Sequence, residues 1–209
     1  MKSRTAAGLM APINLDGALI WPGLLDRQAQ SGLLADVLAV ARVAPPLQHQ
    51  TPHGKLMSVR MTAAGQFGWI SDRAGYRYSS HHPDGQPWPP IPAMVLELWR
   101  SLLPAARDPE CCLVNFYGEG ARMGLHQDRD EADFSQPVLS VSLGDEGLFR
   151  LGGTLRAGST ASHWLKSGDV LALVGPSRLA FHGVDRIRFG SSTLLPDGGR
   201  INLTLRVVT

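Results

Sequence analysis

Apolar and polar positions alternate through most of the second half of the chain, and this pattern predicts strands. Between residues 111 and 208, short runs are richly apolar or alternate with polar residues, and Gly, Pro, Asp or Ser separate them. The runs are CCLVNFY, PVLSVSLGD, LFRLGG, DVLALVG, RLAFHGV and RINLTLRVV. Short strands at this spacing are typical of an antiparallel sandwich or barrel.

The first half carries a helical period in two places. One set of apolar residues at helical spacing predicts an amphipathic helix, which ends before the prolines at 45 and 46. The set comprises Leu33, Leu34, Val37, Leu38 and Ala41. A second set predicts a helix within residues 92–104, and it comprises Met94, Val95, Leu98, Trp99 and Leu102. Residues 51–90 hold strand-like pieces, many glycines and prolines, and several aromatic residues.

These patterns predict a mainly β protein with N-terminal helices. The stretch AARDPE, residues 105–110, is a joint between the mixed half and the all-β half. We therefore expect residues 1–110 to form an N-terminal region and residues 111–209 to form a β core, within one compact unit.

Composition and charge narrow the class of protein. The chain has 209 residues, 44% hydrophobic content and a net charge of +2, which is ordinary for a soluble globular protein. Charge is locally uneven, because residues 55–82 hold four basic residues against one acid. The only cysteines, Cys111 and Cys112, are adjacent and fit a reducing compartment better than a disulfide framework. No apolar run reaches membrane-spanning length, so we expect a cytoplasmic protein without a membrane partner.

A histidine and an acid two positions apart are candidate metal ligands. His126 and Asp128 point the same way if they lie on a strand, and His182 in RLAFHGV supplies a third ligand. Two imidazoles and one carboxylate suit Fe(II) in oxygenases and also catalytic zinc. The alternative is that an isolated H-x-D pair is accidental and that His182 is structural. The chain has other histidines (His49, His53, His163 and the pair His81-His82), and we expect the pair on the surface.

The last predicted strand places two arginines and an amide on one face. Arg200, Asn202, Thr204 and Arg206 alternate with apolar residues. One interpretation is a half-exposed strand with its polar face in water. The other is a pocket for a dianion, because the planar guanidinium binds carboxylates in bidentate fashion. Such a pocket beside an iron triad suits 2-oxoglutarate chemistry, whereas a zinc hydrolase has no need for it.

Several motifs in order resemble one known family. NFYGEGARMGLHQDRDE, SVSLG, GDV, SRLAFHGV and RINLTLR together resemble the AlkB family of Fe(II)- and 2-oxoglutarate-dependent dioxygenases, which demethylate nucleic acids. Upstream, TPHGKLMSVRMTAAGQFGW and GYRYS with PWPPIP are similar to the nucleotide-recognition region of the bacterial repair enzyme. The resemblance covers roughly residues 50–209 and implies a double-stranded β-helix (jelly roll) core with an N-terminal nucleotide-recognition lid.

The resemblance also implies roles for individual residues. His126, Asp128 and His182 match the iron ligands. The 2-oxoglutarate contacts match Asn115, Tyr117, Arg200, Asn202 and Arg206. Of these, Arg200 with Tyr117 is expected at the distal carboxylate and Arg206 with Asn202 at the end that chelates iron. The substrate contacts match Trp69, Tyr76, Tyr78, Asp130 and Arg156.

The activity implied is oxidative demethylation of N-alkylated bases such as 1-methyladenine and 3-methylcytosine. The substrate would be single- or double-stranded DNA, or RNA, and the enzyme would act as a monomer with Fe(II), 2-oxoglutarate and O2. The alternatives are an RNA-, tRNA- or protein-modifying dioxygenase, or a non-catalytic jelly-roll binding module. Leu151 and Leu173 stand where the bacterial enzyme has aromatic residues, which bears on pocket shape and preferred lesion.

Overall fold

The computed structural model describes residues 11–51 and 53–209, and strands dominate it. The elements in chain order are β1 (Ile13–Leu15), β2 (Ala18–Trp21), α1 (Arg27–Val43), β3 (Leu47–Gln50), β4 (Leu56–Gly65), β5 (Gly68–Asp72), β6 (Gly75–Ser79), α2 (Ala93–Leu102), β7 (Cys111–Tyr117), β8 (Met123–His126), β9 (Val138–Gly144), β10 (Glu146–Leu151), β11 (Ala161–Leu165), β12 (Val170–Leu173), the 3-10 turn η2 (Gly175–Ser177), β13 (His182–Arg188) and β14 (Arg200–Arg206).

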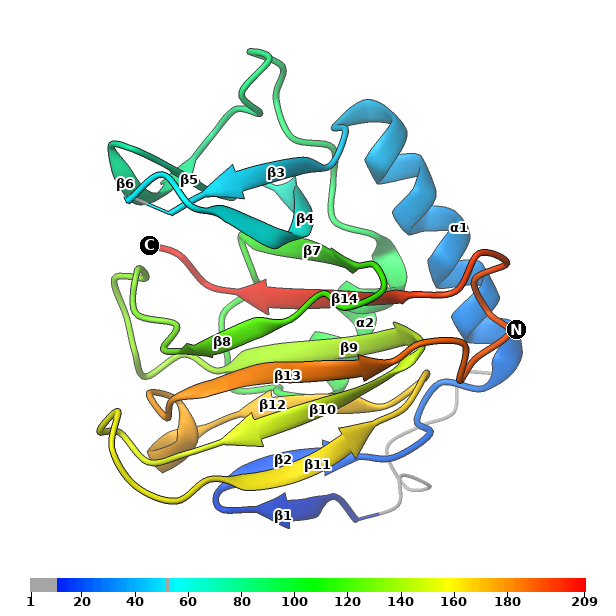
Figure 1. Cartoon of the computed structure of the whole chain (residues 1–209), viewed down its shortest axis with the longest axis vertical. Coiled ribbons are helices and arrows are strands. Elements are labelled where there is room, and N and C mark those ends of the chain that lie inside the picture. The colour runs from blue at the N-terminus through cyan, green and yellow to red at the C-terminus, as the bar shows by residue number, and fades with distance from the viewer. Residues whose placement is uncertain (1–10, 52) are drawn as a thin grey trace.

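Two facing sheets form the body of the molecule. The major sheet has the order β1-β2-β12-β9-β14-β7-β4-β3, and the minor sheet has the order β11-β10-β13-β8. Figure 1 shows the minor sheet in front of the major sheet, with α2 behind and α1 along one side. The pairings recorded for the described strands are antiparallel. The predicted jelly-roll core with N-terminal helices is confirmed.

Both predicted helices form and cover the outer face of the major sheet. Asp26 caps α1 by accepting a hydrogen bond from the Ala29 amide at 2.9 Å, and α1 ends at Val43, before the proline pair. Leu33 of α1 and Trp99 of α2 are fully buried in one cluster with residues of β7, β9 and β14. In the described part of the chain, no helix is long and apolar enough to cross a bilayer.

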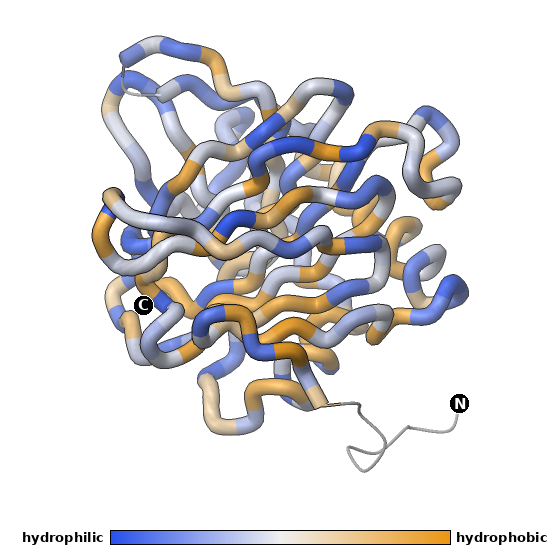
Figure 2. Tube along the Cα trace, turned by 60° about the horizontal axis from the view of Figure 1, so that its bottom comes forward, coloured by the Kyte–Doolittle hydropathy of each residue, from blue (hydrophilic) through white to orange (hydrophobic). Residues whose placement is uncertain are grey.

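Strand β14 lies at the centre of the major sheet, between β9 and β7, and is buried on both faces. Ile201, Leu203 and Leu205 pack toward the helices. Arg200 and Arg206 belong to the opposite face and are only 1% and 5% exposed. Figure 2 shows hydrophobic segments in the extended runs through the middle of the molecule, where they alternate with hydrophilic ones. The interpretation of a half-exposed strand is therefore wrong, because the minor sheet covers the polar face.

Several boundaries differ from the sequence-based ones. The predicted strand in RLAFHGV begins only at His182, since η2 and a loop precede it, and it runs on to Arg188. Strand β8 ends at His126, so Asp128 lies just past the strand and not on it. Strands β1, β2, β3 and β11 were not predicted. The division at residue 110 stays a prediction, although β4 pairs with β7 and the two parts share the major sheet.

The predicted lid contains the hairpin β5–β6, which pairs Trp69 with Tyr78 and Ser71 with Tyr76. Gly68 allows this hairpin to approach Trp88 closely, because a Cβ atom there would lie 2.3 Å from the indole ring. The surface prediction holds for His81 but is wrong for His82. The ring of His82 is buried, lies within 3.1 Å of the Pro45 carbonyl through Nε2, and packs edge-on against Trp88.

Candidate metal centre and cosubstrate pocket

Two histidines and an aspartate converge between the sheets. His182 at the start of β13 lies directly across from His126 at the end of β8, because these two residues are in register in the antiparallel pair. Asp128 follows β8 by two residues and turns its carboxylate to both rings. The Nε2 atoms of His126 and His182 lie 3.8 and 3.7 Å from Asp128 Oδ1 and Oδ2, respectively. The three ligand atoms lie within 4.8 Å of one another.

Main-chain carbonyls orient both imidazoles. The Nδ1 atom of His126 lies 2.9 Å from the Gly124 carbonyl, and Nδ1 of His182 lies 3.0 Å from the Ala180 carbonyl. A carbonyl oxygen only accepts, so Nδ1 carries the proton in each ring and the Nε2 lone pair points to the centre. This is the tautomer that a metal requires.

Charge and burial favour the protonation states that bind a metal, namely the ionised carboxylate of Asp128 and the neutral imidazole of His182. Burial alone would raise the pKa of Asp128, but Arg206 and the two histidines outweigh it and hold that pKa well below the ordinary value. Burial, reinforced by the neighbouring His126, lowers the pKa of His182 to about 4. A carboxylate therefore faces a neutral imidazole at neutral pH.

The donor set fits an iron ion. Within the described residues, the buried Oδ2 atom of Asp128 has no hydrogen-bond partner. An unpaired buried carboxylate oxygen is costly, and a cation between it and the imidazoles would satisfy it. Two imidazoles and one carboxylate leave coordination positions open, as in oxygenases that use Fe(II).

A narrow cavity of about 70 Å³ extends from the two histidines along the polar face of β14. All predicted cosubstrate residues line it, namely Asn115, Tyr117, Arg200, Asn202 and Arg206. Three buried polar atoms of this set have no hydrogen-bond partner among the described residues: Asn115 Oδ1, Arg200 Nε and Arg206 Nε. The cavity is therefore lined by two guanidinium groups and an amide, which fits a dicarboxylate.

The far end of this cavity is built around Arg200. Its guanidinium donates to the Asp145 carbonyl at 3.2 Å, the Leu165 carbonyl at 3.3 Å and Ser142 Oγ at 2.7 Å. Burial lowers the pKa of Arg200 and raises that of the nearby Tyr117 phenol to about 12. The partners of the guanidinium are neutral, so its positive charge remains for an anionic ligand.

A wider cavity of about 950 Å³ opens on the other side of the triad, below the lid. All predicted substrate residues line it, namely Trp69, Tyr76, Tyr78, Asp130 and Arg156. The rings of Trp69 and Tyr76 stack with centroids 5.4 Å apart. Arg156 donates to the Leu125 carbonyl at 3.1 Å, which holds the loop between β10 and β11 against β8, the strand that ends at His126.

Asp130 has a hydrogen-bond partner in the lid that the sequence did not predict. The indole N–H of Trp69 donates to Asp130 Oδ2 at 2.8 Å. The acid is otherwise exposed at the rim of the wider cavity. It therefore joins the lid to the loop after β8.

Comparison with known proteins identifies this arrangement. The family model described as the 2OG-Fe(II) oxygenase superfamily matches residues 17–206. A Caulobacter vibrioides protein, the α-ketoglutarate-dependent dioxygenase AlkB homolog, is 59% identical over 188 residues, covering 90% of this chain and 86% of the relative. The α-ketoglutarate-dependent dioxygenase AlkB of Escherichia coli is 40% identical over 183 residues, covering 85% and 84%.

The chain is an AlkB-family dioxygenase of the 2OG-Fe(II) oxygenase superfamily. Its fold agrees, since the solved structure of OsALKBH1 superposes with a TM-score of 0.81 at 28% identity, covering 93% of this chain and 98% of that one. The enzyme uses Fe(II), 2-oxoglutarate and O2. The family resemblance and the dioxygenase class predicted from the sequence are confirmed, and a non-catalytic binding module is not favoured.

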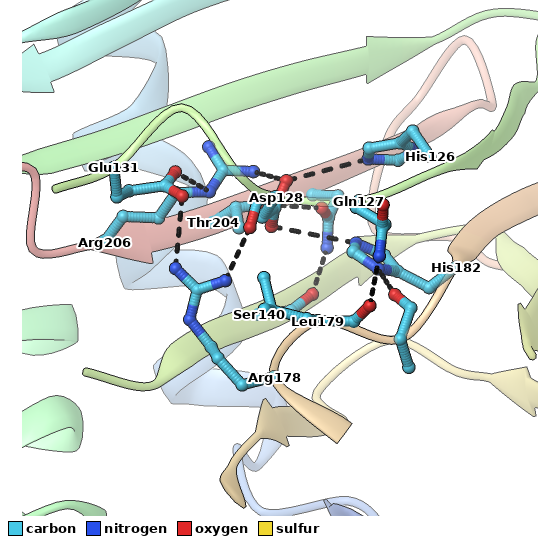
Figure 3. Close-up of polar contacts among 12 residues, drawn as sticks. His126, Gln127, Asp128, Glu131, Ser140, Arg178, Leu179, His182, Thr204 and Arg206 are labelled. Carbon is cyan, nitrogen blue, oxygen red and sulfur yellow. Dashed lines mark hydrogen bonds and ion pairs between the residues drawn. The ribbon is translucent and has the colours of Figure 1, made fainter. Parts of the chain in front are cut away.

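Sequence reasoning missed two buried charged residues of this dioxygenase. Glu131 and Arg178 form an ion pair at 3.1 Å with side chains 2% and 3% exposed. Figure 3 shows both beside Asp128 and Arg206. In the sequence, Glu131 ends the run DRDE, which is typical of a solvated surface loop. Only the tertiary packing shows that it is buried.

The two departures from the bacterial pattern lie close to the metal. Leu151 on β10 is fully buried and is in register with His182, and Leu173 lines the narrow cavity. Leu173 is therefore part of the wall of the narrow cavity, whereas Leu151 lies beside the candidate ligand His182 on the neighbouring strand. Their effect on the preferred lesion stays a prediction.

Proposed function

We propose that this dioxygenase removes N-linked methyl groups from alkylated bases of DNA, and of RNA, with 1-methyladenine and 3-methylcytosine as representative substrates. The observation that carries the proposal is one continuous arrangement. An arginine-lined cavity reaches the His126–Asp128–His182 triad from one side, and an aromatic, lid-covered cavity reaches it from the other. The first space suits a dicarboxylate and the second suits a flat ring.

In this proposal His126, Asp128 and His182 hold iron. Iron with 2-oxoglutarate and O2 supplies the oxidant, so that one methyl group leaves as formaldehyde while 2-oxoglutarate becomes succinate and CO2. Arg200 and Tyr117 bind the distal carboxylate of 2-oxoglutarate. A second set orients its metal-chelating end, and this set comprises Arg206, Asn202 and Asn115.

The lid presents the base to the metal. A methylated base inside a duplex does not reach a metal between two sheets, so it is flipped out or taken from a single strand. Trp69 and Tyr76 offer ring faces, and stacking on such faces contributes ~1–3 kcal/mol per base. Arg156 and Asp130 lie at the rim, where a phosphate and a base edge would pass. This basic, aromatic lining supports a nucleic-acid substrate over a protein side chain.

We further propose that the enzyme acts as a monomer in the cytoplasm. The location is supported by Cys111 and Cys112, which are free thiols with no exposed area. The small size of the chain and its single pair of facing sheets support the monomer. Size-exclusion chromatography with light scattering tests the second point, and a dimer at micromolar concentration would contradict it.

The decisive experiment is a defined anaerobic reaction. The protein is loaded with Fe(II) and 2-oxoglutarate, mixed with an oligonucleotide that carries one 1-methyladenine, and exposed to O2. Mass spectrometry is expected to show loss of one methyl group, with formaldehyde and succinate in equal amounts. His126→Ala is expected to abolish all three products. A methylated peptide is tested as the alternative substrate. The proposal would be contradicted if the peptide were demethylated and the oligonucleotide were not.

A further inference from the structure

A guanidinium that belongs to neither cavity is buried beside the metal centre. Arg178 is 2% exposed and lies between η2 and β13, four residues before His182. Burying a charged guanidinium is unfavourable unless hydrogen bonds replace its water. Arg178 therefore needs a set of acceptors, and their positions indicate what the side chain does.

Among residues 11–51 and 53–209, the acceptors of Arg178 all lie in the loop between β8 and β9. Nη1 donates to the Asp128 carbonyl at 2.7 Å, Nε donates to the Gln136 carbonyl at 2.6 Å, and Nη2 donates to Glu131 Oε2 at 3.1 Å. Figure 3 shows the planar fork of Arg178 aimed at this loop, with Glu131 on one side and Asp128 on the other. One side chain thus fastens both ends of a loop of nine residues, 128–136.

We propose that Arg178 is a positioning residue for the metal centre. It fixes the main chain at Asp128 relative to the segment that leads into His182, and so sets the distance between two metal ligands from different elements. This inference rests on the proposed assignment of the triad as metal ligands.

The contact to the Asp128 main chain is what distinguishes Arg178 from Arg206. Arg206 donates to the carboxylate of Asp128 at 2.8 Å, so it acts on the side chain. Arg178 acts on the carbonyl of the same residue and leaves the carboxylate to the metal. Glu131 balances the positive charge of Arg178 and also lies 3.4 Å from Arg206 Nε. A lysine at 178 would keep the charge but could not reach three acceptors with one rigid fork.

Binding of Co²⁺ to the protein without cosubstrate tests the proposal. Co²⁺ is a divalent probe whose visible absorption reports ligand geometry. Arg178→Lys is expected to bind Co²⁺ roughly 10- to 100-fold more weakly than the parent chain, with an altered absorption spectrum. Arg100→Lys is the matched control, because Arg100 makes a two-point contact with Asp108 on the exposed surface, and it should bind as the parent does.

Folding is separated from positioning by a second variant. Arg178→Met combined with Glu131→Leu removes both buried charges and keeps apolar volume, so it should unfold cooperatively even if Arg178→Lys does not fold. It is expected to show the same loss of Co²⁺ affinity. Parent-like affinity and spectrum in either folded variant would overturn the inference. If the triple variant His126→Ala, Asp128→Ala, His182→Ala bound Co²⁺ as the parent does, the triad assignment itself would fail.

Discussion

Arg206 Nη2 donates a 2.8 Å hydrogen bond to Asp128 Oδ1, which joins the cosubstrate cavity to the metal centre. The same guanidinium lines the narrow cavity, and its Nε lies 3.4 Å from Glu131 Oε1, an ion pair without hydrogen-bond geometry among the described residues. One arginine therefore faces a proposed metal ligand and the cosubstrate space together. Binding of a carboxylate near the metal and the charge on Asp128 are coupled through this residue.

Arg206→Lys is expected to weaken 2-oxoglutarate binding about tenfold or more. A lysine keeps the positive charge but loses the planar fork, and a hydrogen bond between charged groups contributes about 1.5–3 kcal/mol. The measurement is an anaerobic titration of the Fe(II)-loaded protein with 2-oxoglutarate. Arg188→Lys is the control, because Arg188 pairs with Glu146 away from both cavities. Unchanged affinity in Arg206→Lys would show that the cosubstrate binds elsewhere.

Gly147→Ala is expected to weaken 2-oxoglutarate binding roughly tenfold while metal affinity stays the same. A Cβ atom at this position would lie 2.9 Å from Arg200 Nε and 3.1 Å from its Cζ. Three hydrogen bonds hold the Arg200 guanidinium, so it cannot move away without losing some of them. Gly153→Ala is the control, since nothing lies within 4 Å of a Cβ atom there. Equal affinities in the two variants would place Arg200 outside the cosubstrate site.

Asp130→Asn is expected to slow turnover of cationic 1-methyladenine more than that of neutral 3-methylthymine. The amide oxygen of asparagine still accepts the hydrogen bond from Trp69, so this change removes the charge and keeps the link to the lid. A carboxylate near the ring favours a cationic base through charge and hydrogen bonding. The comparison is kcat/KM on the two oligonucleotides, with Asp130→Ala as the variant that loses both properties. Equal decreases in kcat/KM on both substrates would show that Asp130 does not distinguish cationic from neutral bases.

Stability of the lid region is expected to fall as pH decreases below about 6.5. Burial lowers the pKa of His49 from 6.5, and its ring packs edge-on against Trp69 at 6.0 Å. Below pH 6.5 the unfolded chain binds a proton that the folded His49 site does not, so acid favours the unfolded state. Urea unfolding at about pH 8 and about pH 5 measures the loss. His49→Gln should lose less stability over this range, and an equal loss would assign the effect to other groups.

The periodicity of the sequence was sufficient for the main elements of the fold. The alternation in RINLTLR predicted which side chains share a face, because the period of a strand is two wherever it lies. It did not decide whether the polar face met water, since that depends on the minor sheet, whose strands lie elsewhere in the chain. Strand β1 has only three residues, and β11 has the sequence ASHWL, in which apolar and polar residues do not alternate, so neither pattern stands out from loops.

The proposed ligands were found because two of them lie close together in the sequence and match a chemical pattern. Glu131 and Arg178 were not found, because a charged residue in a loop is exposed in most proteins. Their burial arises from a contact between residues 47 positions apart. Such a contact leaves no trace in local composition.

The place of β14 in the major sheet has a consequence for how the chain is made. This strand follows every other strand in the chain, yet it lies between β9 and β7 in the middle of the sheet. During synthesis from the N-terminus, β1-β2-β12-β9 and β7-β4-β3 therefore emerge as two groups with an open gap between them. The gap closes only when residues 200–206 have left the ribosome. Both arginines proposed to bind 2-oxoglutarate arrive in that same segment, so a nascent chain cannot bind the cosubstrate before its largest sheet is complete.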